Sequence, residues 1–276
     1  MIAKVVVLKW VARLHLYTGL LTFANLVLYA VVGMAALIVT RVSPAPVIWE
    51  EPFTLQPGQS DRALAERVVQ LLGLSLATPV HDFAIKRNSS GVLVLDFYHA
   101  NGRHRVTVLD ARLRVERTRA SLWQYLSTLH VTTAVFKSGD RRLQLWAWWN
   151  EFAMWCLAVM ALSGVAVWCQ RRGTHGRPRR VHRWLGLGSL ALVAIYEVSA
   201  IAMAHRTWFH ADALNRLHRL RGSGLSALLG VALLTLAATG LILWWRMPRE
   251  RRAGAAVLAF GVLFAGGLII WMRLVG

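Results

Sequence analysis

The sequence predicts an all-α polytopic membrane protein with about five membrane-spanning helices and one small α+β domain outside the membrane. Of the 276 residues, 56% are hydrophobic and only 16% are charged, which is too apolar for a soluble domain. Several apolar segments reach the roughly 20 residues that a spanning helix needs. One long stretch between the first two apolar segments has the mixed composition of a soluble domain.

The apolar segments cover roughly residues 14–40, 147–169, 184–204, 225–245 and 253–274. The first follows Lys4, Lys9 and Arg13, as the hydrophobic part of a signal peptide would. It is longer than the roughly 7–15 apolar residues of a signal peptide. We therefore expect an uncleaved first span.

The basic residues predict the orientation of the chain. They outnumber acidic residues 32 to 13 and cluster beside apolar segments, notably at 171–183 and 246–252. The positive-inside rule places these loops and the N-terminus in the cytoplasm, with 42–142 and the C-terminus outside. Such clusters are typical of topology signals and lipid contacts, so we expect a bilayer and no nucleic-acid partner. The loop 205–224 departs from this pattern, because it is expected outside and yet holds several arginines that an anionic group would suit.

The segment 42–142 is expected to contain the soluble domain. Prolines between Pro44 and Pro57 mark a linker at its start. Ser60 then opens SDRALAERVVQLLGL, in which apolar residues recur at helical spacing. Three short β-rich runs follow, GVLVLDFYH, GRHRVTVLD and ARLRVERT, with turns expected at Asn101-Gly102 and Asp110. These patterns predict one helix followed by a three-stranded antiparallel meander.

Spans 1–2 and spans 3–4 resemble two copies of one helical hairpin. RLHLYTGL at the first span matches RVHRWLGL at the third, and LHVTTAVFKSGDRRL before the second matches LHRLRGSGLSALL before the fourth. The second span ends LSGVAVWCQRR and the fourth LAATGLILWWRMPRE. The expected organisation is a first helix at 1–41, an inserted domain with its juxtamembrane segment at 42–142, helices two to four at 143–252, and a fifth helix outside the repeat at 253–276.

The duplication repeats two histidine positions. His15 matches His182 at the cytoplasmic ends of spans 1 and 3, and His130 matches His218 before the outer ends of spans 2 and 4. A pseudo-two-fold axis would make the members of each pair face one another. Two neutral imidazoles are good axial ligands for a six-coordinate haem iron that transfers electrons. His205 is an alternative to His218 as the outer ligand, because it lies about 35 Å from His182 along the third helix.

Other polar residues have expected roles around these pairs. Arg13 and Arg183 flank the inner histidines and are expected to bind haem propionates. Glu197 lies in the middle of the third span, where a carboxyl group is costly, so we expect it to relay protons or to bond a neighbouring helix. His99 and His104 are expected on the surface of the soluble domain. The sequence has no convincing nicotinamide, flavin or iron–sulfur motif, which favours a quinol or a separate cytoplasmic reductase as electron donor.

The motifs above, in this order, resemble the PepSY-associated transmembrane helix family. The resemblance rests on RLHLYTGL, GRHRVTVLDARLRV, LH followed by KSGDRRLQLW, RVHRWLGL, and LHRLRGSG before AATGLILWWR, and it covers nearly the whole chain. It implies a multi-pass protein of the bacterial inner membrane with a PepSY-like periplasmic domain. Members include ferric-siderophore reductases with two b-type haems, so it also implies His15, His130, His182 and His218 as haem ligands.

Three functions follow as hypotheses. The leading one is a dihaem protein that reduces a periplasmic ferric siderophore and so releases Fe(II). One alternative is a non-enzymatic, membrane-anchored PepSY module that regulates or assembles other proteins. The other is a haem-dependent quinol oxidoreductase that serves a different periplasmic acceptor. A haem spectrum separates the first from the second, and a comparison of electron acceptors separates the first from the third.

Overall fold

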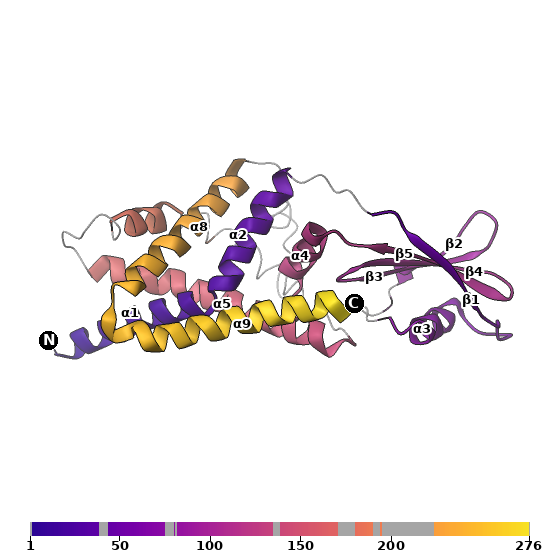
Figure 1. Cartoon of the computed structure of the whole chain (residues 1–276), viewed down its shortest axis with the longest axis horizontal. Helices are drawn as coiled ribbons and strands as arrows, with labels where there is room; N and C mark the ends of the chain where they lie inside the picture. Colours follow the sequence, from indigo (N-terminus) through magenta and orange to yellow (C-terminus); the bar gives the residue numbers. More distant parts are fainter. Residues whose placement is uncertain are drawn as a thin grey trace. The chain divides into compact units, whose positions relative to one another are not determined.

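The computed structural model describes residues 2–38, 44–74, 80, 82–134, 139–170, 180–189, 194 and 224–275. The chain divides into two compact units (Figure 1). The helical unit comprises Met1–Val39 and Trp148–Ile269, and the sheet unit comprises Thr40–Ala147 and Ile270–Gly276. Two long helices have residues in both units, because one begins and another ends in the sheet unit.

The helical unit consists of long apolar helices. They are α1 (Ile2–Leu21), α2 (Phe23–Ile38), α5 (Arg141–Gln170), α8 (Gly224–Trp245) and α9 (Arg251–Val275), with a short helix at 180–189 and the 3-10 turn η2 (Pro248–Glu250). Among the described residues, three helices are long and apolar enough to cross a membrane, or four spans if α1 and α2 count as one. These helices support the prediction that the chain is a membrane protein. The expected count of five stays a prediction, because most of 184–204 lies outside the described residues.

The first predicted span is not one straight helix. α1 and α2 meet at Thr22 with a bend of 59°. The Thr22 hydroxyl donates to the Thr18 carbonyl at 2.8 Å, a side-chain bond of the kind that bends helices. α9 packs against the bend through Gly261, where an added Cβ would lie 2.1 Å from the Leu21 carbonyl oxygen. Sequence periodicity carries no signal of such a bend, so the single first helix expected from the sequence is broken in two, and whether the pair forms one span stays a prediction.

A buried polar cluster links α2 to α5 inside the helical unit. Trp149 Nε1 donates to Asn25 Oδ1 at 2.8 Å, and the Tyr29 hydroxyl donates to Asn150 Oδ1 at 2.6 Å. Asn25 Nδ2 also lies 3.4 Å from Asn150 Oδ1, and both asparagines are fully buried. Hydrogen bonds between apolar helices stabilise their association where water is absent. The cluster therefore fixes how these two helices pack.

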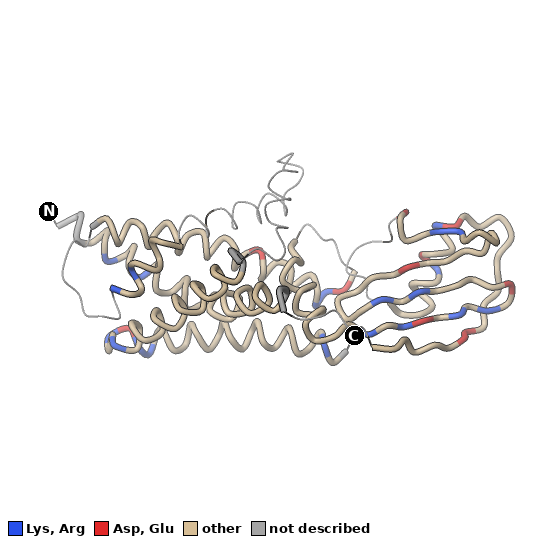
Figure 2. Tube along the Cα trace, turned by 90° about the horizontal axis from the view of Figure 1, so that it is seen from above, with Lys and Arg blue, Asp and Glu red and all other residues tan. Residues whose placement is uncertain are grey.

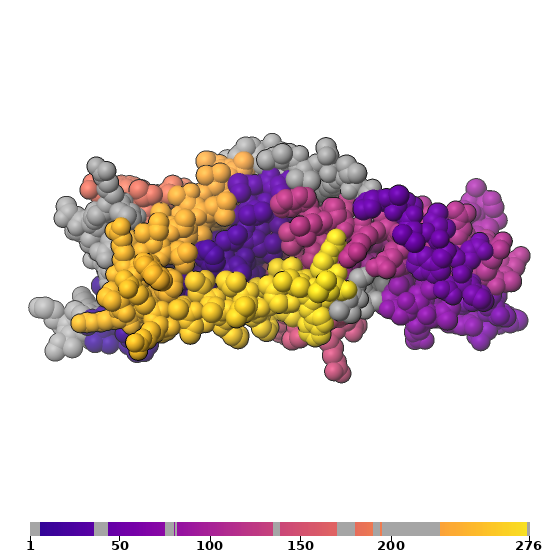
Figure 3. All heavy atoms as spheres, in the orientation of Figure 1, coloured from indigo at the N-terminus to yellow at the C-terminus, as the bar shows by residue number. Residues whose placement is uncertain are grey.

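The outer face of α9 is apolar along its length. Figure 3 shows this helix at the surface of the molecule. Its large apolar side chains are exposed there, with Leu263 at 74% and Leu274 at 77% exposed. A strip of this kind is unfavourable in water and suits contact with lipid.

The sheet unit contains a five-stranded antiparallel sheet in the order β1-β5-β4-β3-β2 (Figure 1). The strands are β1 (Val47–Pro52), β2 (Ile85–Arg87), β3 (Leu93–His99), β4 (Gly102–Val108) and β5 (Arg112–Arg119). Helix α3 (Asp61–Leu71) covers one face, and its first turn is capped by Ser60, whose hydroxyl accepts from Ala63 N–H. The core between them includes Phe53, Leu64, Val68, Leu95, Val106 and Val115.

The predicted meander is present as β3, β4 and β5, but the sheet has two further strands. β1 falls in the stretch that its prolines suggested was a linker, and β2 has only three residues after the 3-10 turn η1 (Asp82–Ala84). Both are edge strands, where proline and charged residues are tolerated because one side of the backbone is unpaired. The sequence of an edge strand therefore shows little of the alternating apolar pattern by which strands are predicted. Whether this α+β unit is PepSY-like stays a prediction.

The C-terminal end of α9 docks on the turn between β3 and β4. Asn101 Nδ2 donates to the Met272 carbonyl at 2.7 Å, and Arg273 Nη1 donates to Asn101 Oδ1 at 3.1 Å. Arg273 also donates to the Ala120 carbonyl at 3.0 Å, just before helix α4 (Leu122–Val131). α4 begins with a capping box made by Ser121 and Gln124. These bonds tie the chain terminus to the sheet.

Candidate functional site

His15 and His182 come together in the helical unit. His15 lies on α1 and His182 on the helix at 180–189, 167 residues apart in sequence. Their ring centroids are 6.3 Å apart and their planes are inclined by 79°. The structure thus brings together the two residues of the predicted inner pair.

A hydrogen bond to α5 shows which ring nitrogen of His15 carries the proton. His15 Nδ1 lies 2.8 Å from the Met160 carbonyl oxygen. A carbonyl oxygen can only accept, so Nδ1 must carry the proton of a neutral imidazole. The second nitrogen, Nε2, then has a lone pair and is able to bind a metal.

Nδ1 is also the protonated nitrogen of His182, where a hydroxyl group is the acceptor. His182 Nδ1 lies 2.8 Å from the Thr239 hydroxyl oxygen on α8. That hydroxyl donates its own proton to the Thr235 carbonyl at 2.7 Å, so it accepts from His182. Nδ1 of His182 is therefore the protonated nitrogen, and Nε2 has the lone pair. A bond of this kind from the other ring nitrogen is usual for metal-binding histidines.

A glycine lies beside each imidazole. A Cβ added at Gly164 on α5 would lie 3.1 Å from His15 Cε1, and one at Gly240 on α8 would lie 3.6 Å from His182 Cε1. The two glycines occupy the same place in the matching ends of spans 2 and 4. Each follows a hydroxyl residue, Ser163 or Thr239, and each lies four residues before a tryptophan, Trp168 or Trp244. Each copy of the predicted repeat thus holds its histidine against a hydroxyl–glycine pair.

The ring separation suits two ligands on opposite sides of one metal. An imidazole nitrogen lies about 2 Å from a bound metal, so each ring centroid lies about 3 Å from it and two opposed rings about 6 Å apart. The observed 6.3 Å is compatible with this arrangement, and with planes inclined by 79° it is equally the spacing of a direct edge-on contact between two rings. The donor set of two neutral imidazoles in apolar surroundings also suits haem iron. On these grounds the residues present fit a haem.

The two predicted propionate ligands have other contacts. Arg13 makes an ion pair of 3.1 Å with Glu250, which also accepts from the Tyr17 hydroxyl at 2.5 Å. The guanidinium of Arg183 lies 5.5 Å from the ring centre of Trp168. Both arginines remain next to the inner histidines, but the charge of Arg13 is already balanced. Glu250 was missed in the sequence, because it stands in a basic loop where a single carboxylate gives no pattern.

The outer pair is not described. His130 is half-buried near the end of α4 in the sheet unit. His218, its alternative His205, and Glu197 lie outside the described residues. The roles expected for them stay predictions.

The structure reveals a second histidine pair, in the sheet unit. The His99 and His104 rings are 4.9 Å apart, and Trp49 packs edge-on against His104. His104 is only 7% exposed, so the expectation that it lies on the surface was wrong. Its alternation with Val106 and Val108 on β4 is the signal that places it on the core face. Burial and the charge of Arg117 lower the pKa of His104 to about 4.

No larger metal cluster of histidine, cysteine or carboxylate side chains is found among the described residues. The His15–His182 pair has two imidazoles and is smaller than a cluster of this kind. Comparison with known proteins adds nothing further: no family model, no curated protein and no solved structure matches the chain. The resemblance to PepSY-associated proteins therefore depends on the quoted motifs alone.

Proposed function

We propose that this protein carries electrons across a membrane on haem and reduces a ferric siderophore on the far side, releasing Fe(II). The observation that carries the proposal is the His15–His182 pair, with rings 6.3 Å apart and both Nδ1 protons engaged by hydrogen bonds. Two such imidazoles have few other uses among apolar helices, where an unpaired polar side chain is costly.

The residues of the inner site would hold the haem and keep its iron closed to other ligands. His15 and His182 would both bind its iron, and a haem held in this way would supply one-electron transfer and would not bind oxygen. Met160 and Thr239 fix the rings so that Nε2 of each is presented. Gly164 and Gly240 let the two rings lie close to α5 and α8, and Arg183, next to His182 in the sequence, would serve the carboxylates of the haem.

The remaining parts of the proposal follow from topology. The second b-type haem would lie between His130 and either His218 or His205. Electrons would enter from a quinol or a cytoplasmic reductase and leave toward the periplasmic side, in the inner membrane of a bacterium. The substrate gains one electron, and its oxygen ligands hold the softer Fe(II) less tightly than Fe(III). The release of iron thus needs no covalent chemistry from the protein.

The test is the haem content of the purified full-length protein. We expect reduced b-type absorption bands and two haems per chain, with loss of one haem in His15→Ala and in His182→Ala. Gly164→Val should act like His15→Ala, because its side chain would press on that ring. Gly188→Val is the matched control, since an added Cβ there meets nothing within 4 Å.

Two outcomes would replace the proposal. Colourless wild-type protein, made with ample iron and haem precursor, would leave a membrane-anchored regulatory or assembly module. Haem that is reoxidised by other acceptors but not by ferric siderophores would indicate a quinol oxidoreductase with a different periplasmic substrate.

A further inference from the structure

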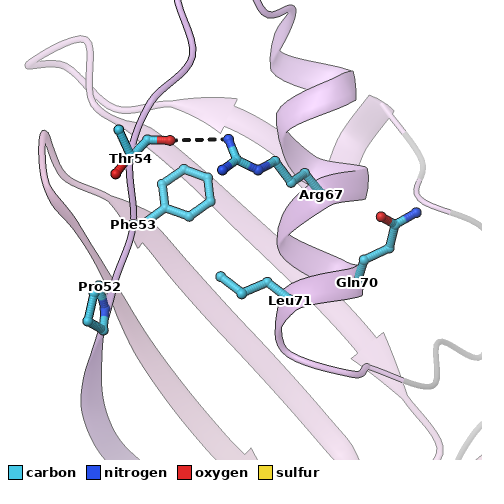
Figure 4. Close-up of a pocket in the computed structure, with 6 residues that line it drawn as sticks. All are labelled: Pro52, Phe53, Thr54, Arg67, Gln70 and Leu71. Atoms are coloured by element: carbon cyan, nitrogen blue, oxygen red, sulfur yellow. Dashed lines mark hydrogen bonds between the residues drawn. The ribbon is translucent and has the colours of Figure 1, made fainter.

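The sheet unit has a hollow between α3 and the chain that follows β1 (Figure 4). Its volume is about 520 Å³, within the range of small-molecule sites. Pro52, Phe53 and Thr54 line one wall, and Arg67, Gln70 and Leu71 on α3 line the other. Leu71 is 55% exposed, so an apolar side chain faces the opening.

Arg67 is the charged group of the hollow, and most of its donors are unused. Its guanidinium lies over the Phe53 ring, 4.7 Å from the ring centre, and Nη1 donates to the Thr54 carbonyl at 3.1 Å. A guanidinium has five N–H donors in all. Within the described residues, the other N–H groups of Arg67 make no hydrogen bond. The contact with Phe53 and the bond to the Thr54 carbonyl position the guanidinium.

Arg67 differs from several other arginines of the sheet unit in having no carboxylate partner among the described residues. Other arginines of the sheet unit bind carboxylates: Arg62 binds Asp82, Arg87 binds Asp61, Arg105 binds Asp96, and Arg112 binds Glu50. Arg67 has no carboxylate partner in the part of the chain that the structure describes. A fixed guanidinium fork without an anion is a ready partner for a carboxylate, which it can bind through two parallel bonds.

We propose that this hollow binds a small aromatic carboxylate. The carboxylate would take the free edge of the Arg67 guanidinium, and the ring would cover the exposed side chains of Leu71 and Pro52. A flat ring suits this place because it fills an apolar wall while losing little conformational freedom. The proposal does not depend on the haem assignment, since every residue that carries it lies in the sheet unit.

The test is binding of benzoate to the full-length protein in detergent, measured by saturation-transfer NMR or calorimetry, with benzamide as the uncharged probe. We expect saturable millimolar binding of benzoate and at least about tenfold weaker binding of benzamide, because hydrogen bonds between charged groups are roughly twice as strong as neutral ones. Arg67→Gln should weaken benzoate binding to the same extent. Arg62→Gln on the same helix is the matched control and should bind as wild type.

Arg67→Gln also removes the contact with Phe53, so a second variant separates binding from folding. Gln70→Glu places a negative charge at the rim without touching that contact, and should likewise weaken benzoate binding while Gln70→Ala does not. The proposal is overturned if benzoate does not saturate, if benzamide binds equally well, or if Gln70→Glu and Arg67→Gln bind as wild type. The haem spectrum should be unchanged in all of these variants.

Discussion

At the scale of single residues, the inner site depends on which ring nitrogen of His15 and of His182 carries the proton. The Met160 carbonyl and the Thr239 hydroxyl each accept from an Nδ1 nitrogen, so both histidines present an unprotonated Nε2. The two acceptors differ in kind, because a backbone carbonyl cannot be removed by mutation and a threonine hydroxyl can. Thr239 is therefore the place to test whether these hydrogen bonds serve a metal ligand.

We predict that Thr239→Val weakens haem retention by about tenfold, because the loss of an outer hydrogen bond to a metal-binding histidine typically costs 10–100-fold in affinity. The measurement is the rate of haem transfer to an apo-globin, together with the midpoint potential of the remaining haem. Thr239→Ser should restore both values. Thr235→Val is the control, because the Thr235 side chain bonds only the Val231 carbonyl and its own carbonyl is kept. Equal behaviour of the two valine variants would contradict the prediction.

At the scale of elements, the sequence predicted those parts whose pattern is local. Ser60 and the apolar spacing after it predicted α3, and the three β-rich runs predicted β3, β4 and β5. The bend at Thr22 and the strand β1 were missed, because Gly261 and β5 that support them lie far away in sequence. The pairing of His15 with His182 was predicted only because the duplication supplied a long-range relation that periodicity lacks.

The bend between α1 and α2 gives a stability prediction. We expect Gly261→Ala to destabilise the helical unit by about 1–3 kcal/mol, since the added Cβ would overlap the Leu21 carbonyl and force α9 away. The measurement is the thermal midpoint in detergent. Gly267→Ala is the control, because nothing lies within 4 Å of its added Cβ and alanine favours a helix. An unchanged midpoint in Gly261→Ala would show that α9 does not pack on the bend.

The buried histidines of the sheet unit give a pH prediction. Burial, together with nearby charge, lowers the pKa of both His99 and His104 to about 4 from an ordinary value of 6.5. The unfolded chain therefore takes up protons between about pH 6.5 and 4 while the folded unit does not, so stability is complete above that range and is lost as the pH falls through it. For the buried His104 alone the loss is at most about 3 kcal/mol.

The consequence should appear first at the β3–β4 turn, because His99 Nδ1 accepts from the Asn101 N–H, and Asn101 holds the end of α9. Hydrogen exchange at this turn, corrected for the intrinsic pH dependence, should accelerate from pH 7 to pH 5. His104→Phe keeps a ring against Trp49 and cannot be protonated, so it should remove the part of the pH dependence that His104 contributes, while His99 keeps the rest. Exchange that is independent of pH in the wild type would exclude this account.

At the scale of the whole molecule, one end of the helices is expected to face the cytoplasm. Arg13 and Tyr17 on α1 both bind Glu250 in the turn between α8 and α9. The beginning of α1 and the basic loop 246–252 therefore lie at the same end of the helical unit, where Figure 2 shows Lys and Arg gathered. The positive-inside rule assigned both to the cytoplasm from sequence alone; which side of the membrane this end faces stays a prediction.

The orientation is testable by the labelling of single cysteines in a variant that lacks Cys156 and Cys169. Ser90→Cys lies in the exposed turn between β2 and β3, and Arg249→Cys lies in the exposed turn before α9. A membrane-impermeant maleimide applied to intact spheroplasts should label Ser90→Cys at once and Arg249→Cys only after lysis, because a charged reagent does not cross the bilayer. Comparable exposure of the two positions makes each the control for the other. The reverse order of labelling would place the sheet unit in the cytoplasm, and a periplasmic iron chelate could then not be its substrate.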